Sequence, residues 1–293
     1  MTLVALVTFA EQPGLTTDDR RFADALVRHG VTAHAVAWDA EVRWDGYAAI
    51  VLRSCWDYHR RLPAFLGWLD GLDAVGATVC NPVQVVRWNA DKRYLRALEQ
   101  RGVAVVPTRW CELLDAATLA EVLVDSGWDA AVVKPSVSAS AQDTWRTSRS
   151  TAEEDEARFH ALTARGTVLV QPFVAAITEV GEWSLVFIGG AYSHAVLKRP
   201  RSGDFRVQHE HGGYAVPAEP SATTILAAET ALAAIGPSLG NEGSAPCLYA
   251  RVDGCIVDRT FVLMELELIE PALFLGEGPG AAERLATALI QTL

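Results

Sequence analysis

The chain is poor in positive charge and in lysine. It carries 25 Lys and Arg residues against 36 Asp and Glu, a formal net charge of -11, and its lysines are limited to Lys92, Lys134 and Lys198. Proteins that wrap nucleic acid or bind anionic membranes need clustered Lys and Arg side chains. We therefore expect neither nucleic acid nor a membrane among its partners.

Long apolar runs and cysteine pairs are also missing. A membrane-spanning helix needs about 20 consecutive apolar residues, and no run approaches that length although 50% of the residues are hydrophobic. Residues 1–11 have no basic leader and are typical of a first strand rather than a signal peptide. The five cysteines lack CxxC spacing, so neither zinc nor a disulfide framework is supported. We expect a cytoplasmic protein in a reducing compartment.

Strands and helices alternate in the first part of the chain. Apolar strands are predicted at 3–7, 31–38 and 47–53, and helices at 18–30 and 60–76. This alternation is typical of a parallel sheet with helices on both faces.

After about residue 84 the strands and helices no longer alternate regularly, and the C-terminal part is rich in predicted strands. The fold class is therefore predicted as α/β, with α+β in the C-terminal half. A length of 293 residues allows two or three small domains, and we expect these over residues 1–84, 85–170 and 171–293.

An acidic row stands near the C-terminal end, at residues 264–271 (MELELIEP). Successive side chains of a strand point to opposite faces. Glu265 and Glu267 then share one face, and Glu270 falls on the other if the strand stays regular to Pro271. Burying two like charges requires a positive partner. A divalent cation is one answer, because hard cations take oxygen ligands.

A hairpin between residues 248–253 and 261–268 brings more charge to that face. With the connection centred on Arg259, Asp253 lies opposite Glu265 and Arg251 lies opposite Glu267. Two interpretations stay open here. One is a cation site, and the other is an Arg251–Glu267 ion pair beside two solvated acids. The apolar setting of both strands favours the first.

Each lysine stands where an anion can bind. Lys134 ends an apolar strand and precedes a loop of small residues at 136–141, whose backbone N–H groups can approach phosphate. Lys92 lies near the start of a helix, an end that favours anions. Lys198 opens the densest positive stretch, which includes Arg206. The alternative for each is a solvent-exposed side chain.

Two further segments are candidates for ligand contact. Pro172 holds Gln171 extended, so the segment 171–174 (QPFV) can offer backbone groups to a purine edge. The loop 53–58 (RSCWDY) follows the third strand, and ligands of parallel sheets bind at the carboxyl ends of strands. The alternatives are an interdomain connection and an ordinary loop with a packed Trp.

The order of these features resembles the ATP-grasp ligases. It runs from the α/β domain through two lysines, the QPFV segment and a basic loop that closes on two glycines, to the acidic strand. Residues 86–95 (VRWNADKRYL) and 53–58 are similar to the subgroup that contains D-cycloserine synthetase. Residues 198–213 are similar to bacterial glutathione synthetase.

The resemblance implies an ATP-grasp fold, in which two α+β subdomains enclose ATP and the N-terminal domain lies on the substrate side. It implies that ATP is contacted by Lys92, Lys134, Gln171, Val174 and either Glu179 or Glu182. It assigns one or two magnesium ions to Asp253, Glu265 and Glu267. Catalytic contacts with the γ-phosphate or the substrate carboxylate are assigned to Lys198, Arg206 and Arg251. Substrate contacts are assigned to Arg53, Trp56, Asp57, Gly212 and Gly213.

Two positions depart from the family pattern. Glu267 stands where the family usually has Asn, so the metal site is one charge more negative. The loop after Lys134 is rich in Ser and Ala where many members use Gly.

The implied activity is an ATP- and magnesium-dependent ligation of a carboxylate to an amine through an acyl phosphate, with release of ADP and phosphate. The subgroup implies cyclisation of O-ureido-D-serine to D-cycloserine, a step of antibiotic biosynthesis. The alternatives are an intermolecular ligase for two amino acids, a nucleotide- or metal-binding protein without catalysis, and a two-lobed binding module. The full set of lysines and acids argues against the last two. A small amino-acid-like substrate is expected, and a homo-oligomer stays possible.

Overall fold

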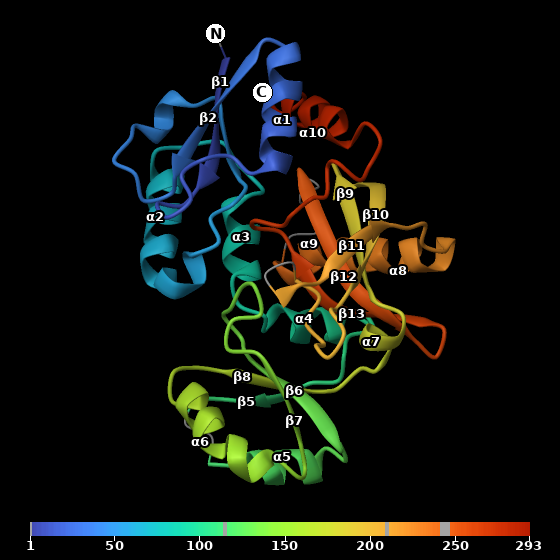
Figure 1. The fold of residues 1–293 in the computed structure, drawn as a ribbon. Coiled ribbons are helices and arrows are strands. Elements are labelled where there is room, and N and C mark those ends of the chain that lie inside the picture. Colours follow the sequence, from blue (N-terminus) through green and yellow to red (C-terminus); the bar gives the residue numbers. More distant parts are fainter. Residues whose placement is uncertain (1, 114–115, 209–210, 241–246) are drawn as a thin grey trace.

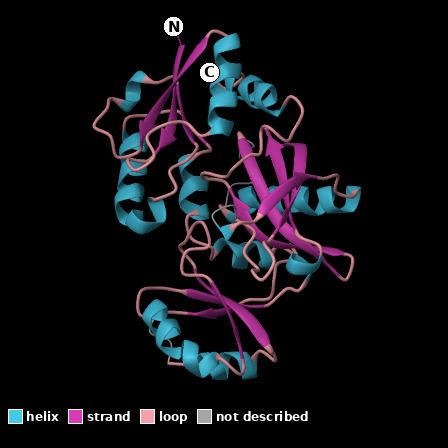
Figure 2. Ribbon diagram, viewed as in Figure 1, coloured by secondary structure: helices cyan, strands magenta, loops and turns pink. Residues whose placement is uncertain are grey.

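The computed structural model describes residues 2–113, 116–208, 211–240 and 247–293, and these form three β-sheets. Figure 1 shows the sheets in three lobes, the first at the top, the second at the bottom and the third at the right. In Figure 2 helices lie on both sides of the first sheet, while those of the second lie together below it. No helix in these ranges is long and apolar enough to cross a membrane.

The first lobe holds a parallel sheet, as the sequence predicts, and its strand order is β2-β1-β3-β4. Its strands are β1 (Thr2–Thr8), β2 (Val31–Ala37), β3 (Ala49–Leu52) and β4 (Val79–Cys80). Its helices are α1 (Thr17–Arg28), α2 (Leu62–Ala74) and the 3-10 turns η1 (Trp44–Gly46) and η2 (Tyr58–Arg61). The last helix, α10 (Ala281–Ile290), lies beside α1 and shares its core, so the C-terminal end of the chain returns to this lobe (Figure 1).

The second lobe is an antiparallel sheet in the order β5-β8-β6-β7. Its strands are β5 (Arg109–Cys111), β6 (Ala130–Pro135), β7 (Trp145–Ser148) and β8 (Val168–Pro172). The helices α5 (Leu119–Asp125) and α6 (Ala152–Thr163) share an apolar core with these strands. The two short strands β5 and β7 were not predicted, because neither has an apolar run.

The third lobe is an antiparallel sheet in the order β11-β10-β9-β12-β13. Its strands are β9 (Glu182–Ile188), β10 (Ala191–Arg199), β11 (Tyr214–Pro217), β12 (Tyr249–Val257) and β13 (Thr260–Glu267). Its helices are α7 (Ala176–Glu179), α8 (Ala222–Ala233) and α9 (Ile235–Ser238).

The helix α4 (Tyr94–Gln100) packs into the core of the third lobe, and α3 (Val83–Asn89) contributes to the cores of both the first and the third lobe. The helix predicted over 89–101 is shortened to α4, α3 precedes it without having been predicted, and Lys92 stands in the break between them. The strand predicted at 103–106 is reduced to backbone hydrogen bonds with Leu263. The boundaries 1–84, 85–170 and 171–293 stay predictions.

Side chains from α3 and α4 hold the outer edge of β13. The Asn89 amide donates to the Leu266 carbonyl at 2.7 Å and accepts from the Leu268 N–H at 2.8 Å. The Tyr94 hydroxyl donates to the Leu266 carbonyl at 3.0 Å and accepts from the Leu266 N–H at 2.8 Å. These bonds satisfy backbone groups that an edge strand leaves open. The acidic strand is thereby fixed in place.

Candidate active site

A cavity of about 670 Å³ lies where the three lobes meet. It is lined by most of the predicted site residues, from the first lobe (Arg53, Trp56), the α3–α4 break (Lys92), the second lobe (Lys134, Gln171), the segment after it (Val174) and the third lobe (Glu182, Lys198, Arg206, Gly213, Arg251, Asp253, Glu265, Glu267). The structure therefore brings fourteen of the seventeen predicted residues to one cavity.

Three predicted residues do not line it. Asp57 is turned into the first lobe, where its carboxylate accepts hydrogen bonds from Trp38 at 2.8 Å and Arg61 at 2.5 Å. Glu179 is exposed on α7, so only Glu182 of that alternative pair reaches the cavity. Gly212 lies outside it, whereas Gly213 packs so tightly that an added Cβ would stand 2.1 Å from the Val207 carbonyl oxygen.

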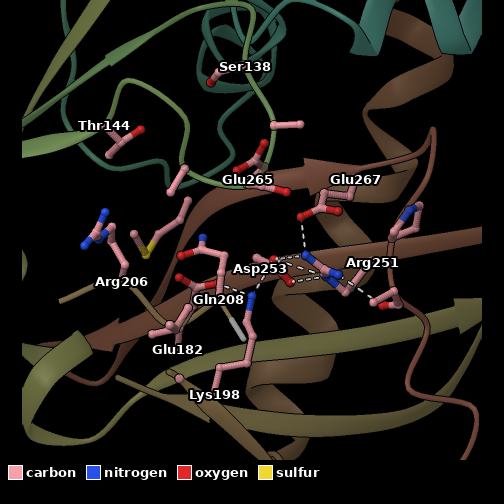
Figure 3. A pocket seen from close by; sticks show the side chains of 18 of the residues that line it. Ser138, Thr144, Glu182, Lys198, Arg206, Gln208, Arg251, Asp253, Glu265 and Glu267 are labelled. Carbon is pink, nitrogen blue, oxygen red and sulfur yellow. Dashed lines mark hydrogen bonds and ion pairs between the residues drawn. The ribbon is translucent and has the colours of Figure 1, made fainter. Parts of the chain in front are cut away.

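The predicted hairpin is confirmed. Asp253 pairs with Glu265 and Arg251 pairs with Glu267 across β12 and β13, and the connection passes through Asp258 and Arg259 with positive φ. The register places the charged side chains on the face that lines the cavity, as Figure 3 shows from close by.

Asp253 is the centre of a charge network in this cavity. Its Oδ2 lies 2.9 Å from Lys198 Nζ and 2.8 Å from Arg251 Nη2, and its Oδ1 accepts from the Ser184 hydroxyl at 2.6 Å. Burial opposes the charge of Asp253, but Arg251 and Lys198 outweigh it and hold the pKa of this carboxyl well below its usual range. Lys198 Nζ also lies 2.5 Å from Glu182 Oε1. In Figure 3 Lys198 reaches Asp253 from below and Arg251 from the right.

Glu267 and Arg251 form the cross-strand ion pair that the alternative interpretation of the hairpin predicts, and both residues line the cavity. Arg251 Nη1 also donates to the Ala272 carbonyl at 3.0 Å. Burial raises the pKa of Glu267 to about 7, because Arg251 only partly offsets it and the charges of Asp253 and Glu265 add to it. The buried Glu267 carboxyl is therefore protonated more readily than an ordinary glutamate.

Lys92 links the acidic strand to the small-residue loop. Its Nζ lies 3.1 Å from Glu265 Oε1 and donates to the Ser138 carbonyl at 2.6 Å. Burial opposes the charge of Glu265, but Lys92 and Lys134 outweigh it and lower the pKa of that carboxyl. The solvent-exposed alternative is wrong for the lysines, since Lys92, Lys134 and Lys198 are 6%, 9% and 6% exposed.

Lys134 is the lysine without a fixed partner. Within the described ranges its side chain makes no hydrogen bond or ion pair, although it lines the cavity. Burial lowers the pKa of its ammonium, and the carboxylate of Glu265 counteracts this. A buried cation of this kind is stabilised by an anion entering the cavity.

Glu270 was placed on the wrong face by the sequence. The strand β13 ends at Glu267, so the two-residue alternation no longer applies, and Glu270 lines the cavity. Burial, followed by the charge of Glu267, raises the pKa of Glu270 to about 8. Pro271 was the signal for the end of the strand, because proline disrupts a sheet ladder.

The start of α1 was also missed. Thr16, Thr17, Asp18 and Asp19 line the cavity. Arg53 Nε donates to Asp19 Oδ1 at 2.8 Å, and Thr16 caps the helix by accepting from the Asp19 N–H at 3.0 Å. Only a fold that places α1 beside the β3 loop could reveal this contact.

The acids fit a metal that is shared with a phosphate. No group of three or more His, Cys, Asp or Glu side chains in the described chain is arranged to hold a metal ion, and both Asp253 oxygens already have cationic or hydroxyl partners. Magnesium, however, is usually bound through one or two carboxylates with phosphate and water completing the octahedron. Glu265 and Glu267, on one face of β13, provide such a pair.

Known proteins resemble the whole chain. Residues 4–81 match the family model for the N-terminal domain of D-cycloserine synthetase DcsG. The cycloserine biosynthesis protein DcsG of Streptomyces lavendulae is 33% identical over 302 residues, which cover 100% of this chain and 99% of that protein.

Solved structures agree with this likeness. The crystal structure of D-cycloserine synthetase DcsG matches with a TM-score of 0.88 and 30% identity over 99% of both chains. The D-alanine–D-alanine ligase of Bacillus anthracis, solved with ATP, matches with a TM-score of 0.68 and 14% identity over 100% of this chain and 97% of that one, which shows a shared fold. The chain has the ATP-grasp fold and is an enzyme of the ATP-grasp ligase superfamily, in which it belongs to the family of D-cycloserine synthetase.

Proposed function

We propose that this enzyme is an ATP- and magnesium-dependent carboxylate–amine ligase that cyclises O-ureido-D-serine to D-cycloserine through an acyl phosphate. The likeness to DcsG over the full chain supports the substrate. The observation that carries the chemistry is the single cavity in which the buried lysines face the acidic hairpin and the loop of the first lobe.

The second lobe and the α3–α4 break form the nucleotide side of the cavity. The Lys134 side chain has no partner among the described residues and is the group best suited to an ATP phosphate, with Lys92 beside the same loop. Gln171 and Val174 line the cavity where adenine would lie against backbone groups. Glu182 faces the ribose in this arrangement while it keeps its ion pair with Lys198.

Magnesium would be held by Glu265 and Glu267, with Asp253 as a further ligand if its ion pairs open. When bound, it supplies positive charge to the phosphate oxygens during phosphoryl transfer. The protein itself contributes position and charge. A carboxylate held beside Arg251 has a fixed donor for the negative charge that develops on its oxygen.

Arg206 lines the cavity from the basic loop and is paired with Asp204 at 2.8 Å. We place it at the γ-phosphate, where it stabilises charge on the group being transferred. Arg53, Trp56 and Gly213 lie on the substrate side. The oxygen-bound nitrogen of the ureidooxy group in the same substrate molecule then attacks the acyl phosphate and expels phosphate as the ring closes. The carbamoyl group on that nitrogen leaves by hydrolysis as carbon dioxide and ammonia, which gives D-cycloserine.

ADP release tests the function. O-ureido-D-serine alone, with ATP and magnesium, is expected to give ADP together with D-cycloserine identified by mass spectrometry. ADP release that requires two amino acids would replace this proposal by the intermolecular ligase. No ADP release from either set of substrates would overturn it. Sedimentation of the same sample decides whether the enzyme is a homo-oligomer.

A further inference from the structure

Among the charged side chains that line the cavity, two acids and one lysine form no ion pair with the described residues. Five acids have a cationic partner: Asp19 with Arg53, Glu182 with Lys198, Asp253 with Lys198 and Arg251, Glu265 with Lys92, and Glu267 with Arg251. Asp18 and Glu270 also line the cavity, but neither forms an ion pair with any residue that the structure describes. The remaining unpaired cation, Lys134, lies on the second lobe.

Asp18 and the backbone next to Glu270 both lie close to Arg53. Arg53 Nη2 donates to the carbonyl of Pro271, the residue after Glu270, at 3.0 Å. The charge of Asp18 acts on the guanidinium of Arg53. Asp18 also accepts a hydrogen bond from the Leu275 N–H at 3.1 Å, at the other end of the same segment. Both acids therefore belong to the end of the cavity formed by α1, the β3 loop and residues 270–275.

A second observation at this end points to a ligand. Arg53 is 2% exposed and lines the cavity, yet its Nη1 has no hydrogen-bond partner among the described residues. A buried N–H group without a partner is costly, so this atom is suited to an oxygen that arrives with a ligand. The end of the cavity thus offers two carboxylates and one unused donor.

The backbone around Glu270 is held from the first lobe. The Trp56 indole N–H donates to the Glu270 carbonyl at 3.1 Å, and Arg53 holds the next residue. A carboxylate on a fixed backbone selects a ligand group by position as well as by charge. Flexible surface acids lack this property.

We propose that Glu270 and Asp18 form a subsite for the primary ammonium group of the substrate, and that Arg53 Nη1 donates to an oxygen of the same molecule. The proposal rests on the proposed function and deepens it. The two ends of the cavity then carry opposite charges. Lys134 attracts phosphate at one end, and the two acids attract an ammonium group at the other. The substrate class is an amino acid with a free amine, and an analogue without that amine is rejected.

The test compares two ligands and two variants. The ligands are O-ureido-D-serine and its counterpart without the amine, 3-(ureidooxy)propanoic acid. The variants are Glu270→Gln and, as a matched control, Glu277→Gln, which removes an exposed carboxylate two residues beyond segment 270–275 that does not line the cavity. Calorimetric binding without ATP and kcat/KM for ADP release are both measured.

The native enzyme is expected to favour the amine-bearing ligand by about 10- to 100-fold, the effect of a charge-assisted hydrogen bond. Glu270→Gln should lose most of this preference by weakening only the amine-bearing ligand, while KM for ATP stays unchanged. Glu277→Gln should keep the native preference. An unchanged preference in Glu270→Gln, or equal binding of both ligands by the native enzyme, overturns the subsite.

The two readouts separate this subsite from the proposed function. If the native enzyme binds O-ureido-D-serine with the expected preference but releases no ADP, the subsite stands and the ligase function fails. If ADP is released but the ratio between the two ligands is the same in Glu270→Gln, the function stands and the subsite fails.

Discussion

Arg251 and Asp253 stand two residues apart on the same face of β12, and the Arg251 guanidinium donates to both oxygens of the Asp253 carboxylate, at 3.0 Å from Nε to Oδ1 and 2.8 Å from Nη2 to Oδ2. Side chains at i and i+2 of a strand share a face, so the strand itself provides the alignment. The same guanidinium contacts Glu267 on the neighbouring strand. One arginine therefore neutralises charge on two strands of the site.

Replacing this arginine should destabilise the fold as well as the reaction. Arg251→Met leaves Asp253 and Glu267 buried without their shared partner, and breaking such pairs costs about 3 to 5 kcal/mol. Urea denaturation measures the loss. Arg251→Lys should recover only part of it, because lysine lacks the planar fork. Arg259→Met, at the exposed β12–β13 turn, is the matched control and should unfold like the native protein. Equal midpoints for both Met variants would contradict the role of Arg251.

The lysines are expected to divide into two kinds. Lys134→Met should leave the free energy of unfolding unchanged or slightly raised, because this buried ammonium has no ion pair in the described chain. It should weaken ATP binding by about 10- to 100-fold, the range for a charged contact. Calorimetric titration with ATP measures the affinity.

Lys198→Met supplies the contrast. It removes the shared partner of Glu182 and Asp253, so it should lower the free energy of unfolding by about 3 to 5 kcal/mol. If Lys134→Met proved the less stable of the two, the assignment of Lys134 as the free phosphate-binding cation would be wrong.

Most of the site could be predicted because its residues are tied to regular elements. The hairpin register follows from strand alternation and a turn near Arg259, and cross-strand pairing within a hairpin needs no tertiary information once both strands are recognised. The parallel sheet of the first lobe likewise follows from the alternation of strands and helices. The three lysines could be predicted as site residues because they stand at the ends of predicted strands or helices.

The remaining features depend on contacts between distant segments. Glu270 enters the cavity because β13 ends early, and Asp57 leaves it because Trp38 and Arg61 bind its carboxylate. Asp18 reaches the site only because α1 packs beside segment 270–275. The periodicity of the sequence cannot predict these contacts, because they are set by tertiary packing.

Glu265→Gln tests the metal assignment. The substitution keeps the volume and the position beside Lys92 but removes one of the two carboxylates available to magnesium. We expect ADP release to fall at least about 100-fold, as for the loss of an electrostatic contact made in the transition state, with a higher magnesium concentration needed for half-activation. Glu277→Gln is the control. Native magnesium dependence in Glu265→Gln would contradict the assignment.

Asn89 should be needed for the position of the acidic strand. Asn89→Ala removes two hydrogen bonds and leaves the Leu268 N–H without its side-chain partner, while the Leu266 carbonyl keeps its bond from Tyr94. An unsatisfied buried group costs about 1 to 3 kcal/mol. Faster hydrogen exchange at the Leu268 amide and a lower urea midpoint are the expected results. Gln84→Ala, on the exposed face of the same helix, is the control and should change neither.

The stability of the ligand-free enzyme should fall with rising pH through Glu270. Its pKa is raised by burial and by Glu267 from an ordinary value of 4.5 to about 8. Between these values the folded protein binds more protons than the unfolded chain, so the free energy of unfolding decreases as the pH rises. Below pH 4.5 both states are protonated and this contribution is constant. Glu270→Gln, which mimics the protonated form, should remove the decline and be more stable than the native protein at pH 8.5 by an amount on the order of a few kcal/mol.

Urea denaturation at pH 5, 7 and 8.5 without nucleotide or magnesium measures the difference. Parallel pH profiles for the two proteins would mean that Glu270 ionises normally in the cavity.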